Sequence, residues 1–149
     1  MTLYLLDANV VQEMHPKGNA QVRVWLASVS DHQLRLSAVM FLERRKGLER
    51  ERFRREKAGK DASDVLAKIA ALAALADEFA DRIVPVDRDV AEEWGRLLAI
   101  SEKHDRDTAY AATARVNDLV LVTRNVKHVV GRDVRVLDPF AKEPAVKTV

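Results

Sequence analysis

The chain has 149 residues, 48% of them hydrophobic, and a formal net charge of +2 at pH 7. This length and composition correspond to about one globular domain and exclude an intrinsically disordered chain. The absence of cysteine excludes disulfides, thiolate zinc sites and a cysteine nucleophile, and it predicts a cytoplasmic protein. No apolar run reaches the roughly 18 residues that a membrane-spanning helix needs, so no membrane partner is expected.

Short apolar strands alternate with amphipathic helices in the first half of the chain. Residues 3–6 form a continuous apolar run, which is typical of a strand that is buried on both faces. Apolar residues spaced along 22–29 predict a short helix, and a strand is expected at 33–37. A long charged helix is then expected from about residue 38 to 57.

The second half continues the alternation. Ser63 is expected to cap a helix whose apolar residues recur three and four positions apart as far as Phe79. Pro85 lies in the next expected strand, 82–86, and suits an edge strand or a strand end. The remaining expected elements are a helix from Asp87 or Arg88, a helix from Asp107 to about Val116, strands at 119–122 and 134–137, and a short helical turn after Asn125.

Strands separated by helices predict an α/β fold of three layers, with a mostly parallel central sheet flanked by helices. The domain is expected to span residues 1–140, with a C-terminal tail at 141–149. Because sites in such sheets lie at the carboxyl ends of the strands, residues that follow the strands are the first candidates for function.

Three acidic residues stand at such positions. Asp7 follows the first strand, Glu43 lies within two helical turns of the second strand, and Asp107 opens an alanine-rich helix. Carboxylates that converge from separate segments repel one another, and a hard divalent cation removes that repulsion. We therefore expect Asp7, Glu43 and Asp107 to bind Mg²⁺ or Mn²⁺ as the catalytic residues of a nuclease.

Each acid also has a structural interpretation. Asp7 alone suits a cap on the following turn, and Asp107 alone suits the first turn of a helix, where the helix dipole favours an acid. Glu43 alone could pair with Lys46 on the surface. The four histidines have no metal-ligand spacing, and His104 is expected to be an exposed residue at a helix end.

A basic stretch follows Glu43. From Arg44 to Lys57 there are eight Lys or Arg residues against three Glu, a local excess of five positive charges. Such a stripe is a candidate surface for a polyanion. The alternative is a solvated helix face with ion pairs between residues three and four positions apart.

Four stretches around these acids resemble the PIN-domain ribonucleases, and among them the VapC/FitB-like toxins of type II toxin–antitoxin systems. They are LLDANVV at 5–11, SAVMFLERRKG at 37–47, DTAYAATA at 107–114 and LVTRNVK at 121–127, so together they span nearly the whole chain. The resemblance implies a metal-dependent endoribonuclease that cleaves structured RNA, such as tRNA or rRNA, to inhibit translation. It also implies a homodimer that is neutralised by a VapB-like antitoxin and reaches operator DNA only through that antitoxin.

The resemblance also assigns residues. Asp7, Glu43 and Asp107 fall on the metal-binding acids of the family, and Asn9, Thr123 and Asn125 fall on its supporting polar positions. Arg44, Arg45 and Lys46, beside Glu43, are expected to contact the RNA phosphates or an acidic patch of the antitoxin.

The chain departs from the family pattern at three places. Ala8 stands where a threonine is common, and residues 40–42 replace a more usual Thr-Leu-Gly. Asn125 stands where many relatives have a fourth acid, so it offers a neutral oxygen instead of a charged one. The alternative function is therefore a non-catalytic PIN-fold partner that acts as a co-repressor with a DNA-binding antitoxin.

Overall fold

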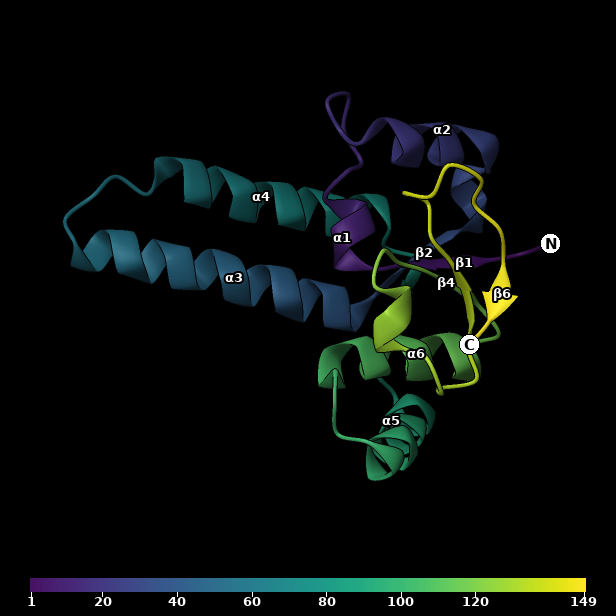
Figure 1. The fold of residues 1–149 in the computed structure, drawn as a ribbon. Coiled ribbons are helices and arrows are strands. Elements are labelled where there is room, and N and C mark those ends of the chain that lie inside the picture. Colours follow the sequence, from purple (N-terminus) through teal and green to yellow (C-terminus); the bar gives the residue numbers. More distant parts are fainter.

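The structure is a computed structural model that describes residues 1–149, and it has an α/β fold. One six-stranded sheet has the order β3-β2-β1-β4-β5-β6 (Figure 1). All neighbouring strands are parallel except β5 and β6. The strands are β1 (Tyr4–Leu6), β2 (Leu34–Ser37), β3 (Ile83–Val84), β4 (Val120–Val122), β5 (Arg135–Leu137) and β6 (Lys147–Thr148). The predicted fold class is thus confirmed.

Helices cover the sheet on both sides. In Figure 1, α2 lies on one side of the sheet and α5 and α6 lie on the other, while α3 and α4 form a hairpin that projects from the body. No helix is both long enough and apolar enough to cross a membrane. The helices are α1 (Ala8–Val11), α2 (Ala20–Ser28), α3 (Ala38–Lys57), α4 (Ser63–Glu78), α5 (Arg88–Ile100) and α6 (Asp105–Val116), with 3₁₀ turns η1 (Asp31–Gln33) and η2 (Val126–His128).

The core lies between the central strands and helix α6. Leu5 and Leu6 of β1 and Val120 and Val122 of β4 are fully buried. Every residue of α6 from 108 to 114 is buried as well, and four of them are alanines. Small side chains allow a helix to lie close to a sheet, so this alanine-rich helix can be covered by the sheet on one face and by α5 on the other.

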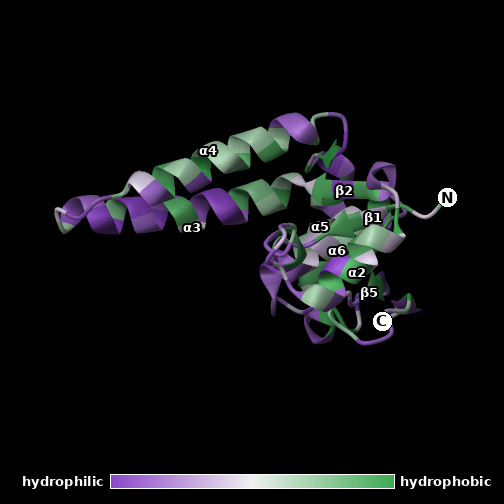
Figure 2. Ribbon diagram, turned by 90° about the horizontal axis from the view of Figure 1, so that it is seen from above, coloured by the Kyte–Doolittle hydropathy of each residue, from purple (hydrophilic) through white to green (hydrophobic).

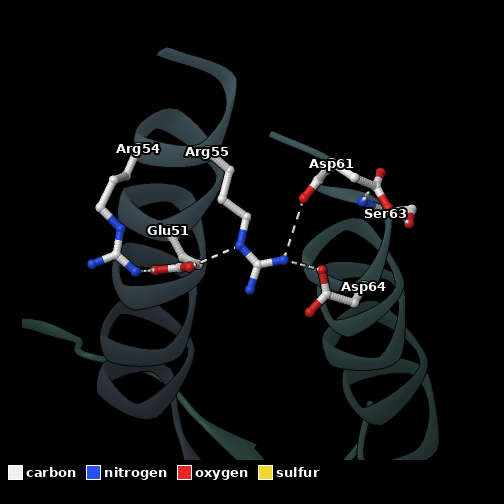
Figure 3. A network of polar contacts seen from close by, with 6 residues as sticks. All are labelled: Glu51, Arg54, Arg55, Asp61, Ser63 and Asp64. Carbon is white, nitrogen blue, oxygen red and sulfur yellow. Dashed lines mark hydrogen bonds and ion pairs between the residues drawn. The ribbon is translucent and has the colours of Figure 1, made fainter. Parts of the chain in front are cut away.

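The α3–α4 hairpin is held at its far end by charged residues. Arg55 of α3 pairs with Glu51 on its own helix and with Asp64 of α4, and it also donates to the carbonyl oxygen of Asp61 (Figure 3). Gly59 ends α3 with a φ of +67°, a conformation that glycine adopts without strain. Figure 2 shows that this end is hydrophilic, whereas the middle of α4 is largely hydrophobic.

Three local expectations need correction. Helix α6 begins at Asp105, so Asp107 lies within its first turn instead of opening it. Ser63 is the first residue of α4, not its cap, and donates its hydroxyl to Asp61 Oδ2 at 2.7 Å. The segment expected as a tail at 141–149 contributes β6, because Val149 exchanges backbone hydrogen bonds with Val134. The domain boundary at residue 140 stays a prediction.

Candidate active site

The acidic site lies where the strand order reverses. The chain passes from β1 outward to β2 and β3, and then returns to β4 on the opposite side of β1. In parallel sheets such a switch point opens a crevice at the carboxyl ends of the strands. Asp7 directly follows β1 and Thr123 directly follows β4, so their side chains meet at this crevice.

Asp7 is held by neighbours from both strand ends. Its carboxylate Oδ2 accepts a hydrogen bond from the hydroxyl of Thr123 at 2.7 Å and from the amide of Asn9 at 3.2 Å. The amide N–H of Asn125 donates to the Thr123 hydroxyl at 3.0 Å, and that of Arg124 donates to Asn9 Oδ1 at 3.3 Å. The Asp7 side chain makes no capping hydrogen bond to α1. The arrangement orients this carboxylate, which is only 4% exposed, and does not use it as a helix cap.

Glu43 reaches the same crevice from the second turn of α3. Its Oε2 accepts a hydrogen bond from the buried hydroxyl of Tyr110 at 3.3 Å, and its Oε1 lies 3.5 Å from the guanidinium of Arg106. Burial and the nearby carboxylate of Asp7 raise the pKa of Glu43 to about 7. Glu43 is therefore not a surface residue paired with Lys46.

Asp107 lies in the first turn of α6 beside η2. Its Oδ2 lies 3.0 Å from Nδ1 of His128, the last residue of η2. The His128 ring is stacked on the ring of His104, with centroids 4.0 Å apart and planes 7° apart. Asp105, two residues before Asp107, is held away from the three acids, since its carboxylate accepts a hydrogen bond from the Trp94 indole at 2.9 Å.

The three carboxylates act on one another electrostatically. Burial raises the pKa of Asp7, as does the charge of Asp107, whereas the hydrogen bond from Thr123 lowers it. Asp107 also contributes to the raised pKa of Glu43. Like charges that raise one another's pKa are the environment that a divalent cation stabilises, and carboxylate oxygens are the ligands that Mg²⁺ and Mn²⁺ prefer. The ligand types present therefore suit such a cation, and the ligand atoms of Asp7, Glu43 and Asp107 would have to move closer together to bind one ion.

A cavity of about 330 Å³ opens beside Glu43. Ala8, at the position where a threonine is common, is one of its walls, and Gly47 is another. A Cβ added to Gly47 would meet no atom within 4 Å, so this glycine does not serve a close packing contact. The full lining is Ala8, Gln12, Glu43, Arg44, Gly47, Leu48 and Arg106.

The basic residues beside Glu43 differ in their surroundings. Arg44 lines the cavity, and Lys46 is exposed; neither makes an ion pair. Arg45 instead pairs with Glu49 at 3.0 Å. Further along α3, the residues whose charge is matched by an acid are Arg52, Arg54 and Arg55. The ion-pair interpretation is therefore confirmed for Arg45, Arg52, Arg54 and Arg55, and the polyanion surface stays a prediction.

Four residues at this site were not expected from the sequence: Tyr110, Arg106, His104 and His128. Tyr110 follows Asp107 by three positions, which places both on one face of a helix, so this spacing could have revealed it. The 24 positions that separate His104 from His128 carry no such signal. Asn125 is near the site through its backbone N–H, and its side chain makes no hydrogen bond.

Comparisons with known proteins concern the family and the fold of the chain. The PIN domain family model matches residues 4–129. Toxin FitB of Neisseria gonorrhoeae (strain ATCC 700825 / FA 1090) is 30% identical over 144 residues, which cover 93% of this chain and 99% of that protein. The solved structure of FitAB bound to an IR36 DNA fragment is 27% identical, with a TM-score of 0.67, over 95% of this chain and 98% of that one. DNA-bound VapBC from Salmonella typhimurium, 18% identical with a TM-score of 0.67 over 93% and 99% of the two chains, shares the fold.

Proposed function

This chain belongs to the PIN domain family, and from that membership and its acidic site we propose that it is a metal-dependent endoribonuclease. PIN domains are generally nucleases and generally use divalent metal ions. The proposed substrate is structured RNA, tRNA or rRNA, whose hydrolysis inhibits translation. In this proposal the protein is the cytoplasmic toxin of a toxin–antitoxin pair; the name of the Neisseria relative calls that protein a toxin.

The observation that carries the proposal is the convergence of three carboxylates at the switch point of the sheet. Asp7 and Glu43 each have a raised pKa to which a neighbouring carboxylate contributes. An exposed acid that served only as a helix cap or a surface ion-pair partner would not have this environment. Several carboxylates close together in a crevice are the usual arrangement in enzymes that hydrolyse phosphodiesters with a divalent cation.

Each residue has a role in this proposal. Asp7 and Asp107 are the principal metal ligands, and Glu43 is a further ligand or orients the attacking water. Thr123 and Asn9 hold Asp7 in place through their hydrogen bonds. A bound Mg²⁺ or Mn²⁺ would lower the pKa of the attacking water and would offset the negative charge on the phosphoryl oxygens.

Tyr110 and Arg106 keep Glu43 directed into the crevice. Arg44 lines the cavity beside Glu43 and is placed to contact a phosphate of the RNA. Lys46 is exposed two positions further along α3. Arg45 becomes available for an acidic patch of the antitoxin once its ion pair with Glu49 is broken. Asn125 supports the site through its backbone N–H on Thr123.

We propose a homodimer and a VapB-like antitoxin as the macromolecular partners. The α3–α4 hairpin projects from the body and exposes large apolar side chains, with Leu42 and Phe53 each 57% exposed and Leu66 51% exposed. Exposed apolar surface on a projecting element favours burial against a partner. Operator DNA is reached only through the antitoxin.

The test is cleavage of a pool of tRNA and rRNA by antitoxin-free protein, with Mg²⁺ or Mn²⁺ and then with EDTA. We expect discrete fragments that require the metal and that disappear in Asp7→Ala. Asp81→Ala is the matched control, because the Asp81 side chain is 88% exposed and the residue is distant in the sequence from the three acids. Cleavage by folded Asp7→Ala at the wild-type rate would contradict the proposal.

The alternative is a non-catalytic co-repressor, favoured by the solved structure in which FitAB is bound to a DNA fragment. It is consistent with the neutral Asn125 and with Ala8, which lower the number of charged or hydroxyl oxygens near the metal. Absence of cleavage by wild-type protein that is folded and binds Mg²⁺ would favour this function. The co-repressor function would then be supported if antitoxin plus this protein shifted the mobility of operator DNA more than antitoxin alone.

A further inference from the structure

A second group of potential metal ligands adjoins the three carboxylates. We propose that His104, Asp107 and His128 form a site for a divalent transition-metal ion that prefers imidazole ligands, with Zn²⁺ as the representative ion. The ligand atoms of these three residues all lie within 4.8 Å of one another. Asp7, Glu43 and Asp107 form no such compact group. The proposed ion thus has its own residues and shares only Asp107 with the acidic site.

The chemistry of the ligands selects the class of ion. Two imidazoles and one carboxylate suit Zn²⁺, Co²⁺ or Ni²⁺, whereas Mg²⁺ prefers oxygen ligands alone. Three protein ligands with open access are the usual number in zinc sites that keep one position for water. His104 is exposed, and Asp107 and His128 are half-buried, so solvent and ions can reach all three.

The existing contacts approach the spacing that such an ion needs. With bonds of about 2.0–2.1 Å, two ligands of a tetrahedral Zn²⁺ lie roughly 3.3 Å apart. Nδ1 of His128 and Oδ2 of Asp107 are 3.0 Å apart, so a cation can replace the hydrogen bond between them with little movement. His104 is stacked on His128, with ring centroids 4.0 Å apart, and its ring must turn to direct a nitrogen at the ion. The exposure of His104 leaves it free to do so.

The backbone around the site is held in a fixed shape. The guanidinium of Arg132, which is 4% exposed, donates to the carbonyl oxygens of Leu97, Ser101 and Lys103 at 2.6, 2.8 and 3.2 Å. These bonds fix the segment that leads to His104. His104 itself has a φ of 55°, an uncommon conformation for a residue other than glycine, and its imidazole makes no capping hydrogen bond to α6. Its ring nitrogens are therefore not used by the fold.

The shared ligand gives the second ion a consequence for activity, and this step rests on the proposed function. A Zn²⁺ ion that binds Asp107 withdraws that carboxylate from the Mg²⁺ or Mn²⁺ site. Zn²⁺ would therefore inhibit the metal-dependent cleavage of RNA, and the two histidines would set the concentration at which it does so.

The test is calorimetric titration of the full chain with Zn²⁺, without Mg²⁺ or Mn²⁺. The main variant is His104→Gly, because glycine removes the imidazole and also suits the positive φ, so the protein stays folded. His128→Ala removes the other imidazole, and His32→Ala is the matched control, since His32 is an exposed histidine outside the site. We expect each of the first two to weaken Zn²⁺ binding at least about tenfold, and His32→Ala to leave it unchanged.

Wild-type affinity for Zn²⁺ in either His104→Gly or His128→Ala, with a cooperative thermal transition in both, would overturn the proposed site. It would place any bound Zn²⁺ on ligands other than that imidazole. The binding measurement does not depend on cleavage, so it stands if the chain proves not to be a nuclease. If the chain is a nuclease, Zn²⁺ should inhibit cleavage in Mg²⁺ at lower concentration for wild type than for His104→Gly, each relative to its own rate.

Discussion

The hydroxyl of Thr123 links two residues that are 116 positions apart in the chain, because it donates to the buried Oδ2 of Asp7. A carboxylate that must hold a metal ion is oriented by such a hydrogen bond, which also favours its charged form. The same hydroxyl accepts the N–H of Asn125, so it ties the loop after β4 to the end of β1.

Replacement of Thr123 by valine keeps the volume of the side chain and removes this hydroxyl. We expect Mg²⁺ affinity and RNA cleavage to fall about tenfold to a hundredfold, because the metal ligand Asp7 is no longer supported. The variant should remain folded by circular dichroism. Thr148→Val on the exposed strand β6 is the control, and an equal loss of cleavage in both variants would contradict the role of Thr123.

The protonation of Glu43 makes the free energy of unfolding depend on pH. In the folded metal-free protein its pKa is raised to about 7 from 4.5. Between these two values the folded protein holds a proton that the unfolded chain has released, so the free energy of unfolding falls as pH rises from 4.5 to about 7. The raised pKa of Asp7 acts in the same direction.

We therefore expect the metal-free protein to lose stability as the pH rises, at a rate below about 1.4 kcal/mol per pH unit for one proton. Urea unfolding at several pH values measures this change. In Glu43→Gln the slope should be smaller, because the amide does not titrate. Added Mg²⁺ should stabilise wild type more as the pH rises through about 7, since metal binding requires the ionised carboxylate. Identical slopes for both proteins would contradict the assigned pKa.

At the scale of elements, the connection between α5 and α6 depends on one buried side chain. Arg132 supplies hydrogen bonds to three carbonyl oxygens, those of Leu97, Ser101 and Lys103. The last carbonyls of a helix have no partners within the helix, and buried ones need a donor from elsewhere. Arg132 thus holds the end of α5 and, through the following segment, the first turn of α6 with Asp107.

Replacement of Arg132 by methionine should lower the free energy of unfolding by about 3 kcal/mol, because one buried and two part-buried carbonyl oxygens lose a charged donor. Chemical denaturation measures this loss. Arg135→Met is the matched control: Arg135 is 42% exposed and pairs with Asp118, which is 95% exposed, so its replacement should have little effect. Equal stabilities of the two variants would show that Arg132 does not hold this connection.

At the scale of the whole molecule, a small net charge conceals an uneven distribution. The net charge is only +2, but α3 combines ion-paired arginines with basic residues that have no acidic partner, namely Arg44, Lys46, Arg50 and, at its end, Lys57. A charge that is already neutralised by a neighbouring acid adds little to polyanion binding. RNA binding should therefore depend on the second group.

The corresponding experiment is RNA binding at several salt concentrations in an Asp7→Ala background, which prevents cleavage. Neutralisation of Arg44, Lys46 and Arg50 by glutamine should reduce the slope of log K against log salt by about 0.7 for each phosphate that the protein no longer neutralises. The same change at the ion-paired Arg45, Arg52 and Arg54 removes equal formal charge and should reduce the slope less. Equal slopes for both triple variants would remove the basis for assigning phosphate binding to Arg44 and Lys46.

The sequence predicted the order of the elements and the neighbourhood of the acids. Helix α3 was expected from about residue 38 to 57 and is found at Ala38–Lys57, because the strand before it and the glycine after it are local signals. Asp7 could be assigned to the crevice because it follows a strand at the carboxyl edge of a parallel sheet, whereas Thr123 was assigned to the site through the resemblance to the PIN-domain ribonucleases. For helix α3 and Asp7, periodicity and topology are sufficient.

Only the tertiary structure decided which side chains meet. Tyr110 and Glu43 are 67 positions apart, and His128 reaches Asp107 from η2, 21 positions further along the chain. The segment expected as a tail forms β6 because β5 would otherwise be an edge with unpaired N–H and C=O groups. Such pairings depend on the packing of residues that are distant in the chain, and no local pattern of apolar or polar residues specifies them.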